Sequence, residues 1–175
     1  MRFKYSSLAF TLFALTLMAA ASDTPAITQI GQLNPSAVYD NAYFGIVAIS
    51  DSTIAVAALE DGYNYGTVYV YVKPAGRWTT MSPSAQLTTT LCCNNGSPLS
   101  ISADGSTILA GVSSAGFNGG GASQLYVRPP SGWQGTVAPV ATLGGGLFSP
   151  QQAISPDGKT IVTTDGFGWS HKSYL

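Results

Sequence analysis

A pattern of apolar, turn-forming and again apolar residues occurs three times along the chain. AISPDGKTIV spans 153–162, and its near-copies are SISADGSTILAG at 100–111 and AISDSTIAV at 48–56. In the second copy, Leu99 and Ile101 alternate with serines, and Asp104-Gly105 supplies the residues of a tight turn before the chain returns. Each copy therefore predicts a β-hairpin. The first copy is a residue shorter and lacks the glycine, so we expect a different turn there.

Two further strands are predicted after each of the first two hairpins. TVYVYV at 67–72 places valines on one face and tyrosines on the other, and QLYV at 124–127 is its counterpart. Prolines follow both segments and end the strands, because proline cannot donate to a ladder. The connections that precede these strands, EDGYNYG at 60–66 and SAGFNGGGA at 114–122, are rich in glycine and are predicted to be loops. A fourth, more polar strand is expected to end at Leu87 in one copy and at Leu143 in the next.

The landmarks of these copies recur at one period. Ile54, Ile108 and Ile161 are 54 and 53 residues apart, and Trp78 and Trp133 are 55 apart. A four-stranded unit of about 50 residues, repeated in tandem, is typical of a β-propeller blade. A β-sandwich is the alternative all-β architecture, but nothing in a sandwich requires all the landmarks to recur together. The sequence therefore predicts an all-β chain of propeller blades, each with four antiparallel strands.

The repeats divide the chain into about two and a half blades. The predicted partial propeller covers 23–175, with blade 1 at about 43–87, blade 2 at about 97–143 and a partial blade 3 at about 147–175. Residues 27–33 match a fourth strand that has no blade before it. Such a chain would expose open strand edges. It is either a truncated product or a unit that closes a ring by self-association.

Residues 1–22 have the pattern of a signal peptide. Arg2 and Lys4 precede an apolar run, Leu8–Met18, and small residues follow at 19–21. The apolar run is shorter than the roughly 20 residues that span a bilayer. We therefore expect cleavage and export to the periplasm or the extracellular medium, with no membrane span in the mature chain.

The charge of the chain argues against nucleic acid as a partner. Charged residues make up 9% of the sequence and the formal net charge is −1. Removal of Arg2 and Lys4 leaves five basic and eight acidic residues, or −3. No basic stripe is present to neutralise phosphates.

The segment from Phe44 to Trp78 resembles the FG-GAP repeat of integrin-α-like β-propellers. Phe44-Gly45 corresponds to the "FG" of that name, whereas the "GAP" end is degraded to Val56-Ala57-Ala58. The resemblance implies a propeller of six or seven blades and, in many members, calcium in an acidic loop. It does not imply one function, since propellers carry adhesion, ligand-binding and enzymatic sites.

The acidic loop residues match calcium ligation poorly. A calcium loop of the form D-x-[DN]-x-[DN]-G needs oxygen ligands at alternating positions. The hairpin turns each offer one carboxylate, and Glu60 and Asp61 form the richest oxygen cluster at the wrong spacing. The sequence favours a turn-forming role for these residues. Calcium at Glu60 and Asp61 is the weaker alternative, and no other cofactor is predicted.

Cys92 and Cys93 are adjacent, in the connection between the two blades. In an exported chain they are candidates for a vicinal disulfide; an intermolecular bridge and a pair of free thiols are the alternatives. No histidine or acidic residue lies near them in the sequence to suggest a redox or metal site.

The remaining chemical signal is aromatic. Exposed aromatic and amide side chains in the glycine-rich loops can bind a protein or glycan partner, and the residues concerned are Tyr63, Asn64, Tyr65, Phe117 and Asn118. The recurring Trp78 and Trp133, like the strand tyrosines, are expected to pack between blades. His171 is the only histidine and no nucleophile elbow occurs, so no enzyme signature is present. We therefore expect a non-catalytic binding or adhesion module; the alternatives are part of a larger propeller enzyme and a non-functional gene fragment.

Overall fold

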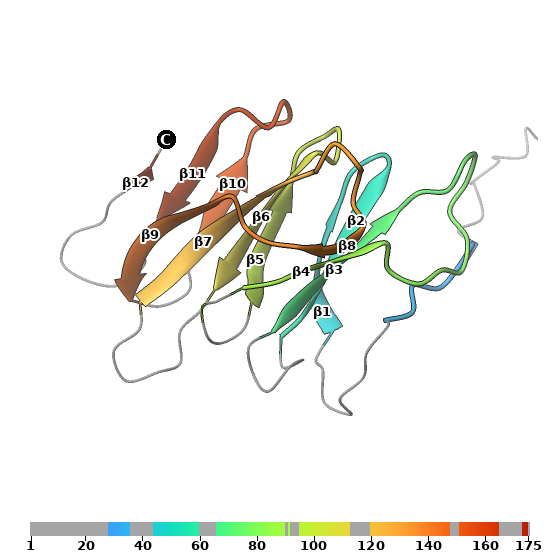
Figure 1. The fold of residues 1–175 in the computed structure, drawn as a ribbon, viewed down its shortest axis with the longest axis horizontal. Coiled ribbons are helices and arrows are strands. Elements are labelled where there is room, and N and C mark those ends of the chain that lie inside the picture. The colour runs from blue at the N-terminus through green and yellow to red at the C-terminus, as the bar shows by residue number, and fades with distance from the viewer. Residues whose placement is uncertain are drawn as a thin grey trace, which may run out of the picture.

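The computed structural model describes residues 28–35, 44–59, 66–89, 91, 95–112, 120–147, 151–164 and 173–174. All regular elements in these ranges are β-strands (Figure 1). Across them, no helix has the length and apolar character needed to cross a lipid bilayer. The predicted signal peptide, residues 1–22, lies outside the described residues.

The first sheet contains the first hairpin and the tyrosine-rich strand. Its four antiparallel strands are β1 (Phe44–Ile49), β2 (Thr53–Ala58), β3 (Thr67–Val72) and β4 (Ala85–Leu87). Because side chains alternate along a strand, Val68 and Val70 point to one face of β3 and Tyr69 and Tyr71 to the other. All four side chains are buried.

The second sheet repeats this arrangement. It contains β5 (Asn95–Ile101), β6 (Thr107–Val112), β7 (Gly120–Val127) and β9 (Ala141–Leu147), in that order. The third sheet contains β10 (Gln152–Ile154), β11 (Ile161–Thr164) and β12 (Ser173–Tyr174). Figure 1 shows the three sheets side by side in chain order, with equivalent strands in equivalent places. The described part of the chain is all-β with a partial β-propeller-like fold, and the predicted fold class is confirmed.

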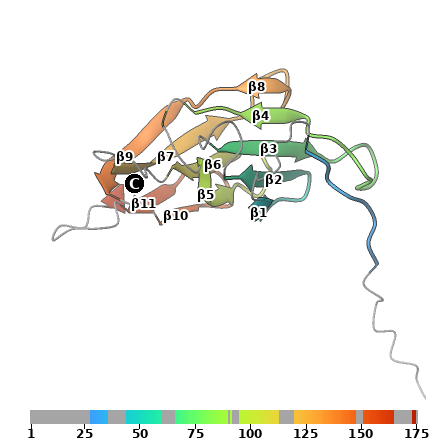
Figure 2. The same ribbon diagram turned by 90° about the horizontal axis from the view of Figure 1, so that it is seen from below.

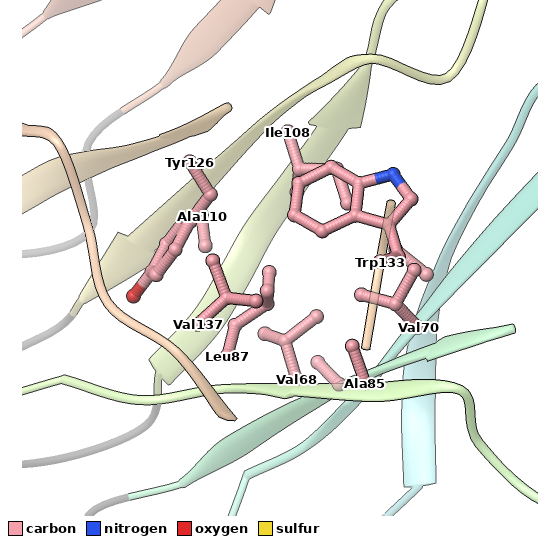
Figure 3. Close-up of a cluster of buried hydrophobic side chains, with 11 residues drawn as sticks. Val68, Val70, Ala85, Leu87, Ile108, Ala110, Tyr126, Trp133 and Val137 are labelled. Atoms are coloured by element: carbon pink, nitrogen blue, oxygen red, sulfur yellow. The ribbon is translucent and has the colours of Figure 1, made fainter. Parts of the chain in front are cut away.

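The main core lies between the first two sheets (Figure 3). The first sheet contributes small and aliphatic side chains, which pack against Ile108, Ala110 and Tyr126 of the second sheet and against Trp133 and Val137 from the segment between β7 and β9. The first-sheet residues are Ala55, Ala57, Val68, Val70, Ala85 and Leu87. The Tyr126 hydroxyl donates across this contact to the carbonyl oxygen of Thr88, at 2.9 Å. Tyr126 and Trp133 therefore pack between blades, as the sequence predicts.

A short parallel strand connects neighbouring sheets. β8 (Gly135–Val137) follows Trp133 in the second repeat, but it pairs with β4 at the edge of the first sheet (Figure 2). Leu87 lies opposite Val137 in this ladder. Since the repeat pattern predicted only four antiparallel strands per blade, this fifth, parallel strand was not anticipated.

The hairpin turns differ in length by more than the sequence pattern suggested. In the first hairpin, the amide of Ser50 donates to the carbonyl oxygen of Thr53 and encloses two residues. In the second, Ser102 pairs in the same way with Thr107 and encloses four. The first turn is therefore two residues shorter, and the expectation of one residue was wrong. The longer turn needs Gly105, which adopts φ +67°.

Glycine-rich segments extend two of the strands beyond their expected ends. β7 begins at Gly120, inside a segment predicted to be a loop, and β9 continues past Leu143 to Leu147. These two extensions pair with each other, with Gly121 opposite Gly146. Glycine normally weakens a strand, so a single segment did not reveal this pairing. In the folded chain, the backbone pairing of β7 with β9 holds these glycines in extended conformation.

Candidate binding surface

The first sheet has an apolar face that no other described sheet covers. This open face points away from the second sheet, and its side chains come from β1, β2, β3 and the two segments beside them: Leu33, Phe44, Val47, Ile49, Ile54, Val56, Tyr69, Tyr71, Trp78 and Met81. Phe44 stacks on Tyr69, with ring centroids 6.1 Å apart. Val47 and Ile49 remain largely exposed. Tyr69 and Tyr71 are buried beneath Leu33, Trp78 and Met81, so the exposed apolar part of this face is formed mainly by β1. Exposed apolar patches are typical of interaction sites.

Residues 28–35 lie along one side of this face. Leu33 forms a parallel bridge with Met81. The amide of Met81 donates to the carbonyl oxygen of Gln32 at 3.0 Å, and the amide of Asn34 donates to the carbonyl oxygen of Met81 at 2.9 Å. The backbone hydrogen bonds thus place the Leu33 side chain against the open face.

A groove of about 250 Å³ separates this segment from the hairpin of β1 and β2. Its walls are almost entirely apolar, and they are formed by Ile30, Gly31, Leu33, Ile49, Ile54, Trp78 and Thr79. The groove is thus suited to aliphatic groups and offers little polar chemistry for a reaction.

The same repeat positions are buried where a neighbouring sheet is present. Ile108 and Trp133 in the second repeat are 0% and 2% exposed, because the first sheet packs on them. Their counterparts on the open face, Ile54 and Trp78, are only half-buried. Ile49 has 66% of its side chain exposed, whereas its counterpart Ile101 is half-buried against the core. The open face therefore has the composition of an interface between blades.

The acidic hairpin turns have a different chemistry. The carboxylate of Asp104 accepts hydrogen bonds from the Ser102 hydroxyl at 2.7 Å, the Ser106 hydroxyl at 2.8 Å and the Ser106 amide at 2.9 Å. These bonds, with the Ser102 hydroxyl contributing most, lower the pKa of Asp104 from 3.8 to about 2. In the third hairpin, the Ser155 hydroxyl and the Lys159 amide lower the pKa of Asp157 in the same way. Both carboxylates therefore hold the conformation of their own hairpin turns by accepting hydrogen bonds within them.

A dependence of stability on pH follows from this hydrogen bonding. Because folding depresses the pKa of Asp104, its contribution to stability is complete above pH of about 4 and is lost as the pH falls towards 2. We expect Asp104→Asn to reduce the acid-induced loss of stability in this window. The effect should be below about 1 kcal/mol, because the carboxylate is exposed to solvent. Urea unfolding at several pH values between 5 and 2 measures it.

Ser106→Ala provides the matched test. It removes one of the two Ser106 donors but keeps the amide, so the pKa of Asp104 measured by NMR should rise part of the way towards 3.8. An unchanged pKa would show that the hydroxyl does not hold the carboxylate.

Within the described ranges, no group of three or more histidine, cysteine, aspartate or glutamate side chains could hold a metal ion. Glu60 and Asp61, the residues considered for calcium, lie outside the described residues. The same is true of Tyr63, Asn64, Tyr65, Phe117 and Asn118, of Cys92 and Cys93, and of His171. These interpretations remain predictions from the sequence.

Sequence reasoning did not identify the open face. A signal for it was present in FGIVAI, the sequence of β1, in which apolar residues occupy consecutive positions from Ile46 to Ile49. A strand with one solvated face alternates apolar and polar residues, whereas a strand covered on both faces does not. The unbroken apolar run therefore indicates that both faces of β1 are suited to packing.

No family model matches the chain, and comparisons with curated proteins and with solved structures found no significant match to either. The resemblance to FG-GAP repeats therefore depends on the sequence landmarks alone.

Proposed function

We propose that the chain is an exported, non-catalytic binding module built from FG-GAP-type propeller blades. Its contact surface is the rim at which the loops after the second strands emerge. This proposal joins the sequence interpretation of the loops and the signal peptide to the repeated geometry of the sheets.

The hydrogen bonding of the hairpin carboxylates is the observation that supports the non-catalytic part of the proposal. Asp104 and Asp157 occupy the same place in successive blades, where polar residues of a propeller could line a shared site. Each accepts hydrogen bonds from serine and backbone groups of its own turn. A carboxylate used in this way gives a turn its shape and is a poor general base, since its pKa lies well below neutral pH.

The arrangement of the strands supports a rim with several loops. β2 ends at Ala58 and β3 begins at Thr67, while β6 ends at Val112 and β7 begins at Gly120. Figure 1 shows the end of β2 and the start of β3 at the same rim as the end of β6 and the start of β7. Aromatic side chains in these two loops would then form one surface for a glycan or protein partner.

Removal of the loop aromatics is the test. We expect the combined variant Tyr63→Ser, Tyr65→Ser and Phe117→Ser to lower affinity at least tenfold, equivalent to about 1.4 kcal/mol. Binding is measured with the labelled chain on an array of defined glycans and on a panel of purified extracellular proteins. The thermal midpoint should be unchanged, because the sequence predicts that these positions lie in loops rather than strands.

The matched control replaces each of these residues with another aromatic residue. Tyr63→Phe, Tyr65→Phe and Phe117→Tyr keep the rings and should retain most of the affinity. If neither panel gives saturable binding, or if the serine variant binds as tightly as the parent chain, the proposed rim is wrong.

A further inference from the structure

The segment before the first sheet occupies the place of a fourth strand. In the complete part of the repeat, β4 ends at Leu87 and pairs in parallel with β8, the strand that follows Trp133. Residues 31–33 likewise pair in parallel with the segment that follows Trp78, through the Leu33–Met81 bridge. Leu33 thus corresponds to Leu87, and Met81 to Val137. Leu33 therefore belongs to a blade that would lie on the open face. The first three strands of that blade are not among the described residues.

The third sheet has the complementary gap. β10, β11 and β12 hold the positions of β5, β6 and β7, as the register shows: Thr163 lies opposite Tyr174, and its counterpart Ala110 lies opposite Gln124. None of the described residues occupies the fourth position beside β12. Among the described residues, Leu33 thus lies at a fourth-strand position with no other strand of that blade beside it, and the third sheet has three strands and no fourth.

The outer surface of the third sheet presents small aliphatic side chains. Gln152 and Thr163 point back to the second sheet: the Gln152 amide donates to the carbonyl oxygen of Leu109 at 2.7 Å, and Thr163 Oγ1 lies 2.7 Å from Ser123 Oγ. Ala153 and Val162, which alternate with them, therefore point outward, and Val162 is 37% exposed.

The equivalent positions in the first sheet are Ala48 and Ala55, and Ala55 packs into the core against the second sheet. Small aliphatic side chains are therefore what this repeat presents to the isoleucine and tryptophan positions of the next blade. The groove beside Ile49, Ile54 and Trp78 is lined by those same positions, and no described residue fills it.

We propose that the open face of one chain receives the third sheet of a second copy of this chain. The segment 28–33 of one copy then becomes the fourth strand of the other copy's third sheet. The described residues of each chain form three sheets, and two copies contribute six, within the range of about four to eight blades found in closed propellers. The contact is head to tail, so it occurs twice and closes the ring. The inference does not depend on the binding function proposed above.

The register of the shared blade follows from the two complete blades. Val68 pairs with Leu87 in the first sheet, and Ser123 pairs with Leu143 in the second. Ser173 holds the corresponding place in β12. In the assembled ring it lies opposite Leu33 of the second copy, and Tyr174 lies opposite Gln32. The outer edge of β9 has no parallel partner among the described residues, and this ring leaves it unpaired.

The mass of the purified chain in solution tests the assembly. Light scattering after size exclusion should give twice the chain mass. A monomer would overturn the proposal and show that something other than a second copy covers the open face. A larger or open-ended assembly would overturn the ring of two.

Charge placed on either surface should separate the copies. Ile49→Asp lies on the open face and Val162→Asp on the third sheet, and we expect each variant to elute as a monomer with an unchanged β spectrum. Both side chains are already partly exposed in the single chain, so the substitutions should leave its fold intact. Val140→Asp is the control. Val140 is 62% exposed but lies on neither of the two surfaces, so this variant should keep the double mass. If Val162→Asp stays dimeric while Ile49→Asp dissociates, the contact joins two open faces and the proposal is wrong.

Mixing the two monomeric variants gives a second, independent test. In a head-to-tail pair of one Ile49→Asp chain and one Val162→Asp chain, both substitutions fall in one contact and the other contact is intact. The mixture should therefore recover dimers that neither variant forms alone. Failure of the mixture to associate would contradict a head-to-tail arrangement.

Cross-linking tests the register itself. In a Cys92→Ser, Cys93→Ser background, chains with Gln32→Cys mixed with chains with Tyr174→Cys should form a disulfide-linked pair under mild oxidation. Directly opposed strand residues have the spacing that a disulfide requires. Neither variant should cross-link by itself. Equal cross-linking of the single variants would rule out the predicted register.

Discussion

Replacement of Trp133 by alanine is expected to lower the free energy of unfolding by about 3–5 kcal/mol. The indole is 2% exposed, and it lies in the core between the first two sheets (Figure 3). Its Nε1–H also donates to the carbonyl oxygen of Gly105 at 2.8 Å, so the substitution removes a packed ring and leaves a buried acceptor unpaired. Urea denaturation followed by circular dichroism measures the loss.

Trp133→Phe separates the two contributions. Phenylalanine keeps most of the aromatic packing but cannot donate to Gly105, and we expect a loss of about 1–3 kcal/mol. If the alanine variant loses less than about 1 kcal/mol, the core between these sheets does not determine the stability of the chain.

Gly105→Ala is expected to cost about 2–5 kcal/mol, for two separate reasons. The residue adopts φ +67°, a left-handed conformation that costs a residue with a Cβ atom about 1–2 kcal/mol. A Cβ atom there would also lie 2.5 Å from Thr53 Oγ1 and 2.7 Å from Ser50 Oγ, in the turn of the first hairpin. The two blades would have to move apart, and strain of this kind typically costs about 1–3 kcal/mol.

Gly158→Ala is the matched control, because Gly158 holds the same turn position in the next blade. Its φ is +71°, but a Cβ atom would approach Thr107 Oγ1 no closer than 3.1 Å. This variant should show the conformational cost with little of the steric one. Equal losses of stability in the two variants, measured by thermal and urea unfolding, would show that the close approach at Gly105 is unimportant.

Much of the fold could be predicted from sequence, because each segment can be compared with its copy in the next repeat. The hairpins recur around Ile54, Ile108 and Ile161, and alternation in TVYVYV assigns the faces of β3. The recurrence of Trp78 and Trp133 indicated packing between blades, and Trp133 is buried there. Local patterns and period were sufficient for these features.

The features that sequence did not reveal depend on contacts distant in the chain. β8 is only three residues long and pairs with a strand about 50 residues earlier, so its sequence contains no alternation that could identify it. The pairing of Gly121 with Gly146 likewise stabilises glycines that would weaken an isolated strand. The open face was missed because FGIVAI was interpreted as one half of a hairpin, and its second apolar face was given no partner.

The position of β8 also restricts how such repeats can be exchanged between proteins. One sequence repeat contributes β5, β6, β7 and β9 to its own sheet but places β8 in the sheet before it. A recombination event that inserts one repeat of about 50 residues therefore transfers a blade together with the edge strand of its neighbour. The inserted blade fits only if its β8 equivalent can pair in parallel with the fourth strand of the preceding blade. Blades can consequently be exchanged only between proteins in which the short strand after the tryptophan pairs equally well with the neighbouring fourth strand. In this repeat that strand is Gly135–Val137, so three residues of each repeat are the ones to compare.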